Sequence, residues 1–284
     1  MEKNHNSLVN PLRIDGLAKK ALYCAFFCAH YLILIEPALA ESGAFQCELN
    51  TNHTAEAVTV KYVYDGDTVR LTDNRKVRLI GIDTPELARE NKPAQPFAKE
   101  AKHALQQLIS TSQNKVNLVY GTEKYDRYGR ALAHLFHIDG TNIQSELLLN
   151  GYAIAYTTPP NSQYSDCYFS KEHMGRKNGK GLWSHSRYEI LQANMLNSNT
   201  NGFRIIEATV NNVSITENNI WLNFDNKIRA QIRKKDIHFF NLASLKCYIG
   251  KKVSIRGWIH PKTDNFYLAL RHPSAIKLLN DKQC

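Results

Sequence analysis

Two aspartates interrupt a segment whose side chains otherwise alternate between apolar and polar, which is typical of a half-buried strand. Asp65 and Asp67 flank a glycine in YVYDGDTVRLT, and a second strand-like segment, RKVRLIGIDTPE, has Asp83 near its end. Carboxylates at the ends of neighbouring strands meet at one rim of a barrel, where they repel one another unless a cation lies between them. A hard divalent ion such as Ca²⁺ accepts carboxylate, carbonyl and water oxygens together. The pattern therefore predicts a metal site.

A further carboxylate and two arginines accompany the same segments. Glu86 follows Asp83 by three residues and can reach the same rim without binding the metal. Tyr128 and Arg130 lie on either side of a turn glycine, and guanidinium groups such as that of Arg130 fit phosphate oxygens. Arg78 precedes Asp83 by five residues, so strict alternation directs them to opposite strand faces unless a bulge or twist intervenes. The residue types predict a site that binds phosphate.

The elements that must position these residues are short. Strand patterns cover residues 57–71, 75–86, 115–120 and 130–138, and helical spacing covers residues 95–110 and 142–151. Short strands with few helices favour a mainly β, α+β fold, in which a small barrel carries packed helices. Strand ends gather at one rim of such a barrel, which would bring Asp67 and Asp83 together.

Residues 1–40 have the layout of a secretory signal peptide. Basic residues, an apolar run over residues 21–35 and the small residues ALA at 38–40 follow one another in that order. The apolar run is shorter than the ~20 residues that a membrane-spanning helix needs. We expect cleavage before Glu41 and a secreted or periplasmic chain without a stable membrane anchor. An uncleaved anchor is the alternative.

Removal of the signal peptide would leave four cysteines, Cys47, Cys167, Cys247 and Cys284. An even number of cysteines in an oxidising compartment predicts two disulfides. Three pairing schemes are open, one of which joins Cys47 to Cys167 and Cys247 to Cys284. The sequence has no cysteine or histidine spacing that is typical of a zinc site.

Positive charge is concentrated in the C-terminal part of the chain, whose net charge over 284 residues is +10. Residues 41–200 hold 18 lysines and arginines against 17 acidic residues, whereas residues 201–284 hold 14 against 6. The polar run NMLNSNTNG between these parts is typical of a linker. We predict a signal peptide (1–40), an N-terminal extension (41–56), a first domain (57–190), a linker (191–202) and a basic second domain (203–284).

The second domain contains five strand-like runs, with a helical pattern at residues 235–244 between the third and the fourth. That order is typical of a second small OB-like barrel. Its aromatic residues include Trp221, Phe224, Phe239, Phe240, Trp258, Phe266 and Tyr267. Its basic residues include Arg229, Arg233, Lys234, Lys235, Lys251, Lys252, Arg256 and Arg271. A positive groove with stacking rings holds single-stranded nucleic acid, so we hypothesise a tether that raises the local substrate concentration. The alternative is that the rings form the barrel core.

The first domain resembles the staphylococcal nuclease (thermonuclease) family. The resemblance runs in order through YDGDTVRL, VRLIGIDTPE, DRYGRALAHLF, NGYAIAY and GKGLW, and covers roughly residues 57–186. It implies a five-stranded OB-type barrel with helices. It also implies Ca²⁺-dependent hydrolysis of DNA and RNA that leaves 3′-phosphate and 5′-hydroxyl ends.

The resemblance implies a role for each residue of the pattern. The implied metal ligands are Asp67, Asp83 and the carbonyl of Thr84, with Asp65 just outside them. The implied catalytic residues are Glu86, which activates water, and Arg78 and Arg130, which bind the scissile phosphate. The implied nucleotide pocket is lined by Tyr128 and Tyr156.

Two features depart from the family pattern. Thr157 and Thr158 follow Tyr156 where the family often has a second tyrosine, so stacking on a base would be weaker there. Residues 87–96 differ from the family's loop after the glutamate, which leaves the placing of Glu86 open.

Three functions from different classes fit these observations. The favoured one is an exported, Ca²⁺-dependent nuclease that acts as a monomer on DNA and RNA, because the acidic and basic positions of the pattern are all present. The second is a catalytically inactive, exported nucleic-acid-binding protein on the same fold. The third is a surface or envelope protein whose basic domain binds lipid or polysaccharide.

Overall fold

The computed structural model describes residues 47–49, 54–90, 92–225, 227–262 and 265–279. The predicted signal peptide and its cleavage site lie outside the described residues. In the part of the chain that is described, no helix combines the length and the apolar character needed to cross a membrane.

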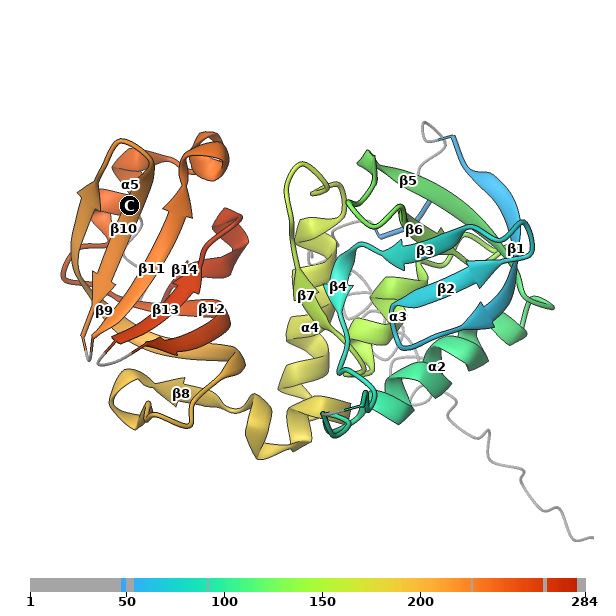
Figure 1. Ribbon diagram of the computed structural model, residues 1–284, viewed down its shortest axis with the longest axis horizontal. Coiled ribbons are helices and arrows are strands. Elements are labelled where there is room, and N and C mark those ends of the chain that lie inside the picture. The colour runs from blue at the N-terminus through green and yellow to red at the C-terminus, as the bar shows by residue number, and fades with distance from the viewer. Residues whose placement is uncertain (1–46, 50–53, 91, 226, 263–264, 280–284) are drawn as a thin grey trace, which may run out of the picture. The chain divides into compact units, whose positions relative to one another are not determined.

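The first strands form a closed five-stranded barrel (Figure 1). They are β1 (Glu56–Val63), β2 (Thr68–Leu71), β3 (Lys76–Leu79), β5 (Lys115–Tyr125) and β6 (Ala131–Phe136). Their order is β1-β2-β3-β6-β5, and neighbours are antiparallel except that β3 runs parallel to β6. Apolar residues such as Val69, Val77 and Leu118 alternate into the interior, where they are buried. The expected barrel is therefore confirmed.

Three helices and a small sheet accompany this barrel. The helices are α2 (Ala98–Ser110), α3 (Ile143–Leu149) and α4 (Ser165–Lys177), and the sheet pairs β4 (Gly81–Asp83) with β7 (Ile154–Tyr156). Helix α3 begins after Asn142, whose side chain accepts a hydrogen bond from the backbone N–H of Ser145 and so caps the helix. Leu105 of α2 and Leu147 of α3 join the barrel's apolar core. The small sheet connects the end of β3 to the segment that carries Tyr156.

A break in the second predicted strand decides where Arg78 points. Strand β3 ends at Leu79 and β4 begins at Gly81, which has a φ of +82°. A Cβ at Gly81 would collide with the ring of Tyr168, so both the backbone conformation and the space require glycine. Strict alternation does not continue across this break. The odd spacing of five residues therefore does not place Arg78 and Asp83 on opposite faces, and their side chains form an ion pair.

A second barrel follows with the same strand order. Its strands are β9 (Gly202–Ile215), β10 (Asn219–Phe224), β11 (Ile228–Arg233), β12 (Lys252–Lys262) and β13 (Asn265–Ala269). They are ordered β9-β10-β11-β13-β12, and β12 pairs back with β9, which closes the barrel. Strands β11 and β13 are parallel, as β3 and β6 are in the first barrel. The expected second OB-like barrel is confirmed.

Shorter elements complete the two barrels. Strands β8 (Ile190–Gln192) and β14 (Ile276–Leu278) extend the second sheet at its edges. The segment predicted to be helical between the third and fourth strands forms the 3-10 helix η4 (Lys234–Phe239) and the short helix α5 (Leu242–Cys247). The other 3-10 helices are η1 (Gly181–Ser184), η2 (Ser186–Tyr188), η3 (Ala193–Met195) and η5 (Pro273–Ala275).

The aromatic residues of the second barrel divide between its core and its surface. Those that are buried in the core or pack against it are Phe224, Phe239, Phe240 and Phe266. Trp221 and Tyr267 lie edge to face outside the core, with ring centroids 6.2 Å apart. The guanidinium of Arg229 lies 4.9 Å from the Trp221 ring. Only part of the predicted aromatic set is therefore available for a ligand.

An ion pair and an apolar cluster join the second barrel to the first. Arg256 of β12 donates two hydrogen bonds to Glu172 of α4, with Nη1 2.8 Å from Oε1 and Nη2 2.6 Å from Oε2. Ile154 and Leu182 share an apolar cluster with Phe203 of β9. Arg256 was predicted to face nucleic acid, but its guanidinium is engaged in this ion pair.

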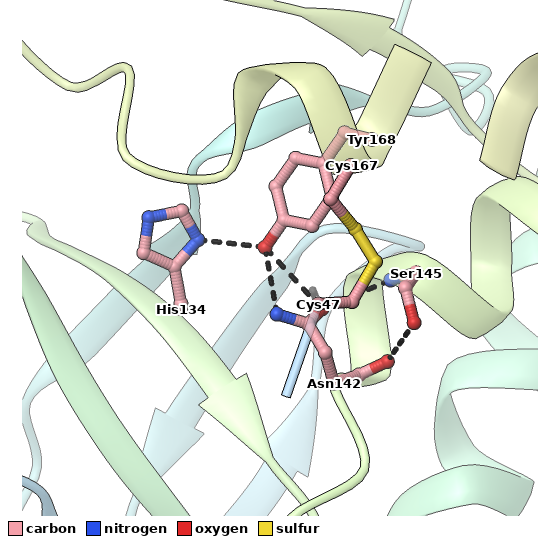
Figure 2. Close-up of a disulfide and its surroundings, with 6 residues drawn as sticks. All are labelled: Cys47, His134, Asn142, Ser145, Cys167 and Tyr168. Carbon is pink, nitrogen blue, oxygen red and sulfur yellow. Dashed lines mark hydrogen bonds between the residues drawn. A yellow bond between two sulfur atoms is a disulfide. The ribbon is translucent and has the colours of Figure 1, made fainter. Parts of the chain in front are cut away.

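A disulfide joins Cys47 to Cys167 in α4 (Figure 2). Beside it, the hydroxyl of Tyr168 lies 2.7 Å from Nδ1 of His134 and accepts a hydrogen bond from Nδ2 of Asn142. The disulfide joins the segment before β1 to α4, the helix that contacts the second barrel. The other predicted pair includes Cys284, which lies outside the described residues.

Candidate active site

Asp67 is buried in the turn between β1 and β2 and is held by two threonines. Its Oδ2 accepts hydrogen bonds from the N–H of Thr84 at 3.0 Å and from the Thr84 hydroxyl at 2.9 Å. Its Oδ1 accepts a hydrogen bond from the hydroxyl of Thr68 at 3.0 Å. Gly66 permits this approach, because a Cβ there would lie 2.9 Å from the Thr84 Cβ. The glycine between the two aspartates therefore brings Asp67 against the residue that follows β4.

Asp65 stands outside this set of contacts. Its Oδ1 accepts a hydrogen bond from the backbone N–H of Asp67 at 3.2 Å, which orders the turn. Its negative charge also raises the pKa of Asp67, behind the larger effects of burial and of Arg78. Asp65 thus shapes the turn and adds to the negative charge around Asp67.

Arg78 connects the two predicted metal carboxylates. Its Nη1 lies 2.8 Å from Oδ2 of Asp67, and its Nη2 lies 2.8 Å from Oδ1 of Asp83. Nη1 also donates a hydrogen bond to the carbonyl of Leu79. The planar guanidinium suits this arrangement, because its N–H groups point in fixed, divergent directions.

The charge of Arg78 does not offset the effect of burial on the pKa values of Asp67 and Asp83. Burial raises the pKa of Asp67 to about 6 and that of Asp83 to about 7, although Arg78 lowers both. The charge of Asp67 also raises the pKa of Asp83, because two like charges oppose joint ionisation. A second cation would favour the ionised form of both groups.

The donor atoms are of the type that a hard divalent cation takes. Asp67 and Asp83 offer carboxylate oxygens, and Ca²⁺ and Mg²⁺ prefer oxygen ligands. No cluster of three or more His, Cys, Asp or Glu side chains arranged to hold a metal occurs among the described residues. Water or substrate oxygens would therefore have to complete the coordination of an ion between Asp67 and Asp83.

Arg78 and Asp83 line a cleft of about 620 Å³. The same cleft is lined by Tyr128, Arg130 and Tyr156. Arg130 is oriented by Asp126, whose Oδ2 accepts a hydrogen bond from its Nε at 2.6 Å. The ring of Tyr128 is exposed, so it is accessible from the cleft mouth. Several guanidinium groups and two phenol rings thus line one cleft, which suits a phosphate and its attached nucleosides.

Glu86 lies in an adjoining cavity of about 270 Å³, which it lines with Asp83 and Thr84. Its Oε2 accepts a hydrogen bond from Nη2 of Arg89 at 2.6 Å, and both side chains are more than half exposed. The charge of Glu86 nevertheless contributes to raising the pKa of Asp83. Asp83 lines both cavities, whereas Asp67 lines neither and reaches the site through its contacts with Thr84 and Arg78.

Residues of the second barrel line the same cavities. Trp258 of β12 lines both, and Arg271 lines the larger one. The rings of Tyr156 and Trp258 meet edge to face with centroids 4.5 Å apart. The sequence pattern assigned Trp258 and Arg271 only to a separate nucleic-acid-binding domain. No local signal reveals which face of β12 meets the first barrel.

Comparison with known proteins identifies the family of the first barrel. A family model described as staphylococcal nuclease homologue matches residues 76–185. A thermonuclease from Staphylococcus hyicus is 31% identical over 160 residues, which cover 55% of this chain and 93% of the thermonuclease. The chain belongs to the staphylococcal nuclease family. Endonuclease YncB from Bacillus subtilis is 33% identical over 135 residues, which cover 46% of this chain but only 63% of YncB. The SPβ prophage-derived endonuclease YokF from Bacillus subtilis is also 33% identical, with 45% of its length covered.

The staphylococcal nuclease match includes only part of the site. Residues 76–185 contain Arg78, Asp83 and Tyr156, whereas Asp67 precedes them and is joined to them by Thr84 and Arg78. Trp258 lies beyond the match. In this member of the staphylococcal nuclease family, the cleft therefore has a wall that the family match does not include.

Proposed function

We propose that the chain is an exported, Ca²⁺-dependent nuclease that hydrolyses phosphodiester bonds of DNA and RNA and leaves 3′-phosphate ends. The observation that carries the proposal is the contact of Arg78 with buried Asp67 and half-buried Asp83 at a cleft that also contains Arg130. Family membership and the endonuclease names of the relatives support the reaction class. The proposal of export rests on the signal-peptide pattern of residues 1–40.

The chain supplies positive charge where the reaction develops negative charge. When bound, Ca²⁺ stabilises the negative oxygens of the phosphoryl transition state. Asp67, Asp83 and the Thr84 carbonyl would hold the ion. Arg78 turns N–H donors from the carboxylates towards a non-bridging phosphate oxygen, and Arg130 donates to the same phosphate. Such positioning and charge stabilisation is the main contribution that a protein makes to phosphoryl transfer.

Glu86 accepts the proton of the attacking water. The water oxygen forms a bond to phosphorus while the bond from phosphorus to the 5′ oxygen breaks. That oxygen takes up a proton from a solvent water and leaves as the 5′ hydroxyl, and the phosphate stays on the 3′ side. Glu86 must first leave its ion pair with Arg89, which costs little because exposed pairs contribute about 0–1 kcal/mol.

The second barrel binds the flanking nucleic acid. Trp221, Tyr267 and Arg229 form an aromatic and cationic surface group on β10, β11 and β13. Stacking on such rings and attraction to the phosphates both tolerate any sequence. This group therefore retains the polymer near the cleft as a tether.

Incubation of the purified protein with plasmid and with single-stranded DNA, in Ca²⁺ or in chelator, tests the proposal. We expect cleavage of both substrates only in Ca²⁺. The 3′ ends of the products should become extendable by a polymerase only after phosphatase treatment. Retention of DNA without cleavage would instead support the inactive nucleic-acid-binding protein and contradict the nuclease.

A further inference from the structure

Trp258 lines both of the cavities that Asp83 lines. It lines the larger cleft together with Tyr156 and Arg271, and it lines the smaller cavity together with Glu86. Its ring meets the Tyr156 ring edge to face at 4.5 Å. The indole therefore lies between the proposed nucleotide pocket and the proposed water-activating carboxylate, although it belongs to the other barrel.

The neighbours of Trp258 hold its ring in place. Phe203 is its pairing partner on β9, and the two ring centroids lie 5.4 Å apart. Arg256 is two residues earlier on β12 and forms the buried ion pair with Glu172 of α4. Because the ring is held before substrate arrives, little conformational entropy is lost when a ligand packs on it.

Positive charge accompanies the ring. Nε of Arg271 donates a hydrogen bond to Oδ2 of Asp236 at 2.8 Å, and the guanidinium of Arg233 contacts the same carboxylate. One carboxylate thus faces two guanidinium groups, which leaves a positive balance beside the cleft. Such a balance favours a phosphate adjacent to the ring.

We propose that Trp258 stacks on a nucleobase in the active-site cleft and that Arg271 binds the adjoining phosphate. The second barrel is then part of the substrate site as well as a tether. This inference rests on the proposed nuclease function. The occupant is an unpaired nucleotide next to the scissile phosphate, because a ring stacks on a base only where the face of that base is free.

Steady-state cleavage of a short single-stranded oligodeoxynucleotide, at saturating Ca²⁺, tests this assignment. Because Trp258→Ala removes the stacking contact with a base, it should weaken substrate binding and raise KM by about 5- to 150-fold, while kcat changes little. Trp258→Phe keeps a smaller ring and should recover most of the loss. Arg271→Gln should raise KM and also weaken its dependence on salt. Trp183→Phe is the matched control, because Trp183 lines neither cavity, and its KM should equal that of the wild type.

A fluorescence measurement separates stacking from a structural role. The chain has three tryptophans, so Trp183→Phe with Trp221→Phe leaves Trp258 as the only one. In chelator, where the substrate stays intact, the oligonucleotide should quench this signal saturably, and a duplex of the same sequence should quench it less. A loosened barrel contact alone would not produce that difference.

The outcomes distinguish the two proposals. An unchanged KM for Trp258→Ala, or no quenching, would overturn the stacking assignment while wild-type cleavage still supports the nuclease. If the wild type does not cleave, the nuclease proposal fails. Saturable quenching would then still support base binding at Trp258.

Discussion

The guanidinium of Arg256 and the carboxylate of Glu172 form a two-point ion pair, with N–O distances of 2.8 and 2.6 Å. Only 2% of the Glu172 side chain is exposed, and its Oε2 also accepts a hydrogen bond from the backbone of Ala155. The pair therefore connects β12 of the second barrel to α4 and β7 of the first. It holds the strand that carries Trp258 against the cleft.

Arg256→Met should lower the free energy of unfolding by about 3–5 kcal/mol, because it leaves the Glu172 carboxylate buried and unpaired. Urea denaturation measures this change. Adding Glu172→Gln removes the unpaired negative charge and should recover most of the lost free energy of unfolding. Lys252→Met is the control, since it breaks a partly exposed pair with Glu207 and should cost about 0–1 kcal/mol. If Arg256→Met were as mild as this control, the ion pair would not hold the barrels together.

Arg78→Lys should lower kcat by about 10²–10³-fold, the usual cost of one lost donor to a developing oxyanion. A lysine keeps the charge but cannot bridge Asp67 and Asp83 with two fixed N–H groups. Steady-state cleavage measures the loss. Arg75→Lys is the matched control, because Arg75 precedes the same strand and pairs with Glu56 and Asp73 outside the cleft. Near wild-type kcat for Arg78→Lys would contradict the role of Arg78.

Calcium should raise the melting temperature more at about pH 8 than at about pH 5. In the folded state, the pKa values of Asp67, about 6, and Asp83, about 7, lie above those of an exposed aspartate. The metal-free folded state therefore binds more protons than the unfolded state in this interval, so these groups reduce stability as the pH rises through it. A bound cation favours the ionised carboxylates and removes that loss.

Differential scanning calorimetry with and without Ca²⁺ measures the effect across this pH range. Asp67→Asn should abolish most of the calcium-dependent rise. A rise that is the same at both pH values would mean that Asp67 and Asp83 do not bind the ion.

Arg229→Gln should weaken the salt dependence of binding to single-stranded DNA. Loss of one phosphate contact should reduce the slope of log K against log salt by about 0.7. Fluorescence anisotropy in chelator measures that slope without cleavage. Lys277→Gln, on the edge strand β14, is the control and should leave the slope unchanged. Equal slopes for Arg229→Gln and the wild type would remove Arg229 from the tether.

The local patterns predicted much of the two barrels and the two aspartates, Asp67 and Asp83, that Arg78 contacts. The strand before Asp67 and the helix at α2 follow from the alternation and spacing of apolar residues, which depend on neighbours in the sequence. The direction of the Arg78 side chain was harder to predict, because it depends on the break at Gly81. That break in turn depends on the packing of Tyr168. Alternation alone contains no information about such a contact.

The contacts between the barrels could not be predicted from local patterns. Arg256 and Lys252 are both basic residues of the same strand, yet Arg256 pairs with buried Glu172 whereas Lys252 pairs with partly exposed Glu207. Trp258 likewise resembles Trp221, although only Trp258 meets Tyr156. The difference arises from which face of the second barrel packs on the first, and long-range packing decides that.

The most direct test is the single-turnover rate at which the wild type and Asp67→Asn cleave single-stranded DNA, each with Ca²⁺ and with chelator. We predict rapid cleavage by the wild type in Ca²⁺ alone and a rate at least about 10²-fold lower for Asp67→Asn, as for other lost charge-stabilising groups. Equal rates for the two proteins, or wild-type cleavage that persists in chelator, would contradict a metal-dependent nuclease site at Asp67, Asp83 and Arg78.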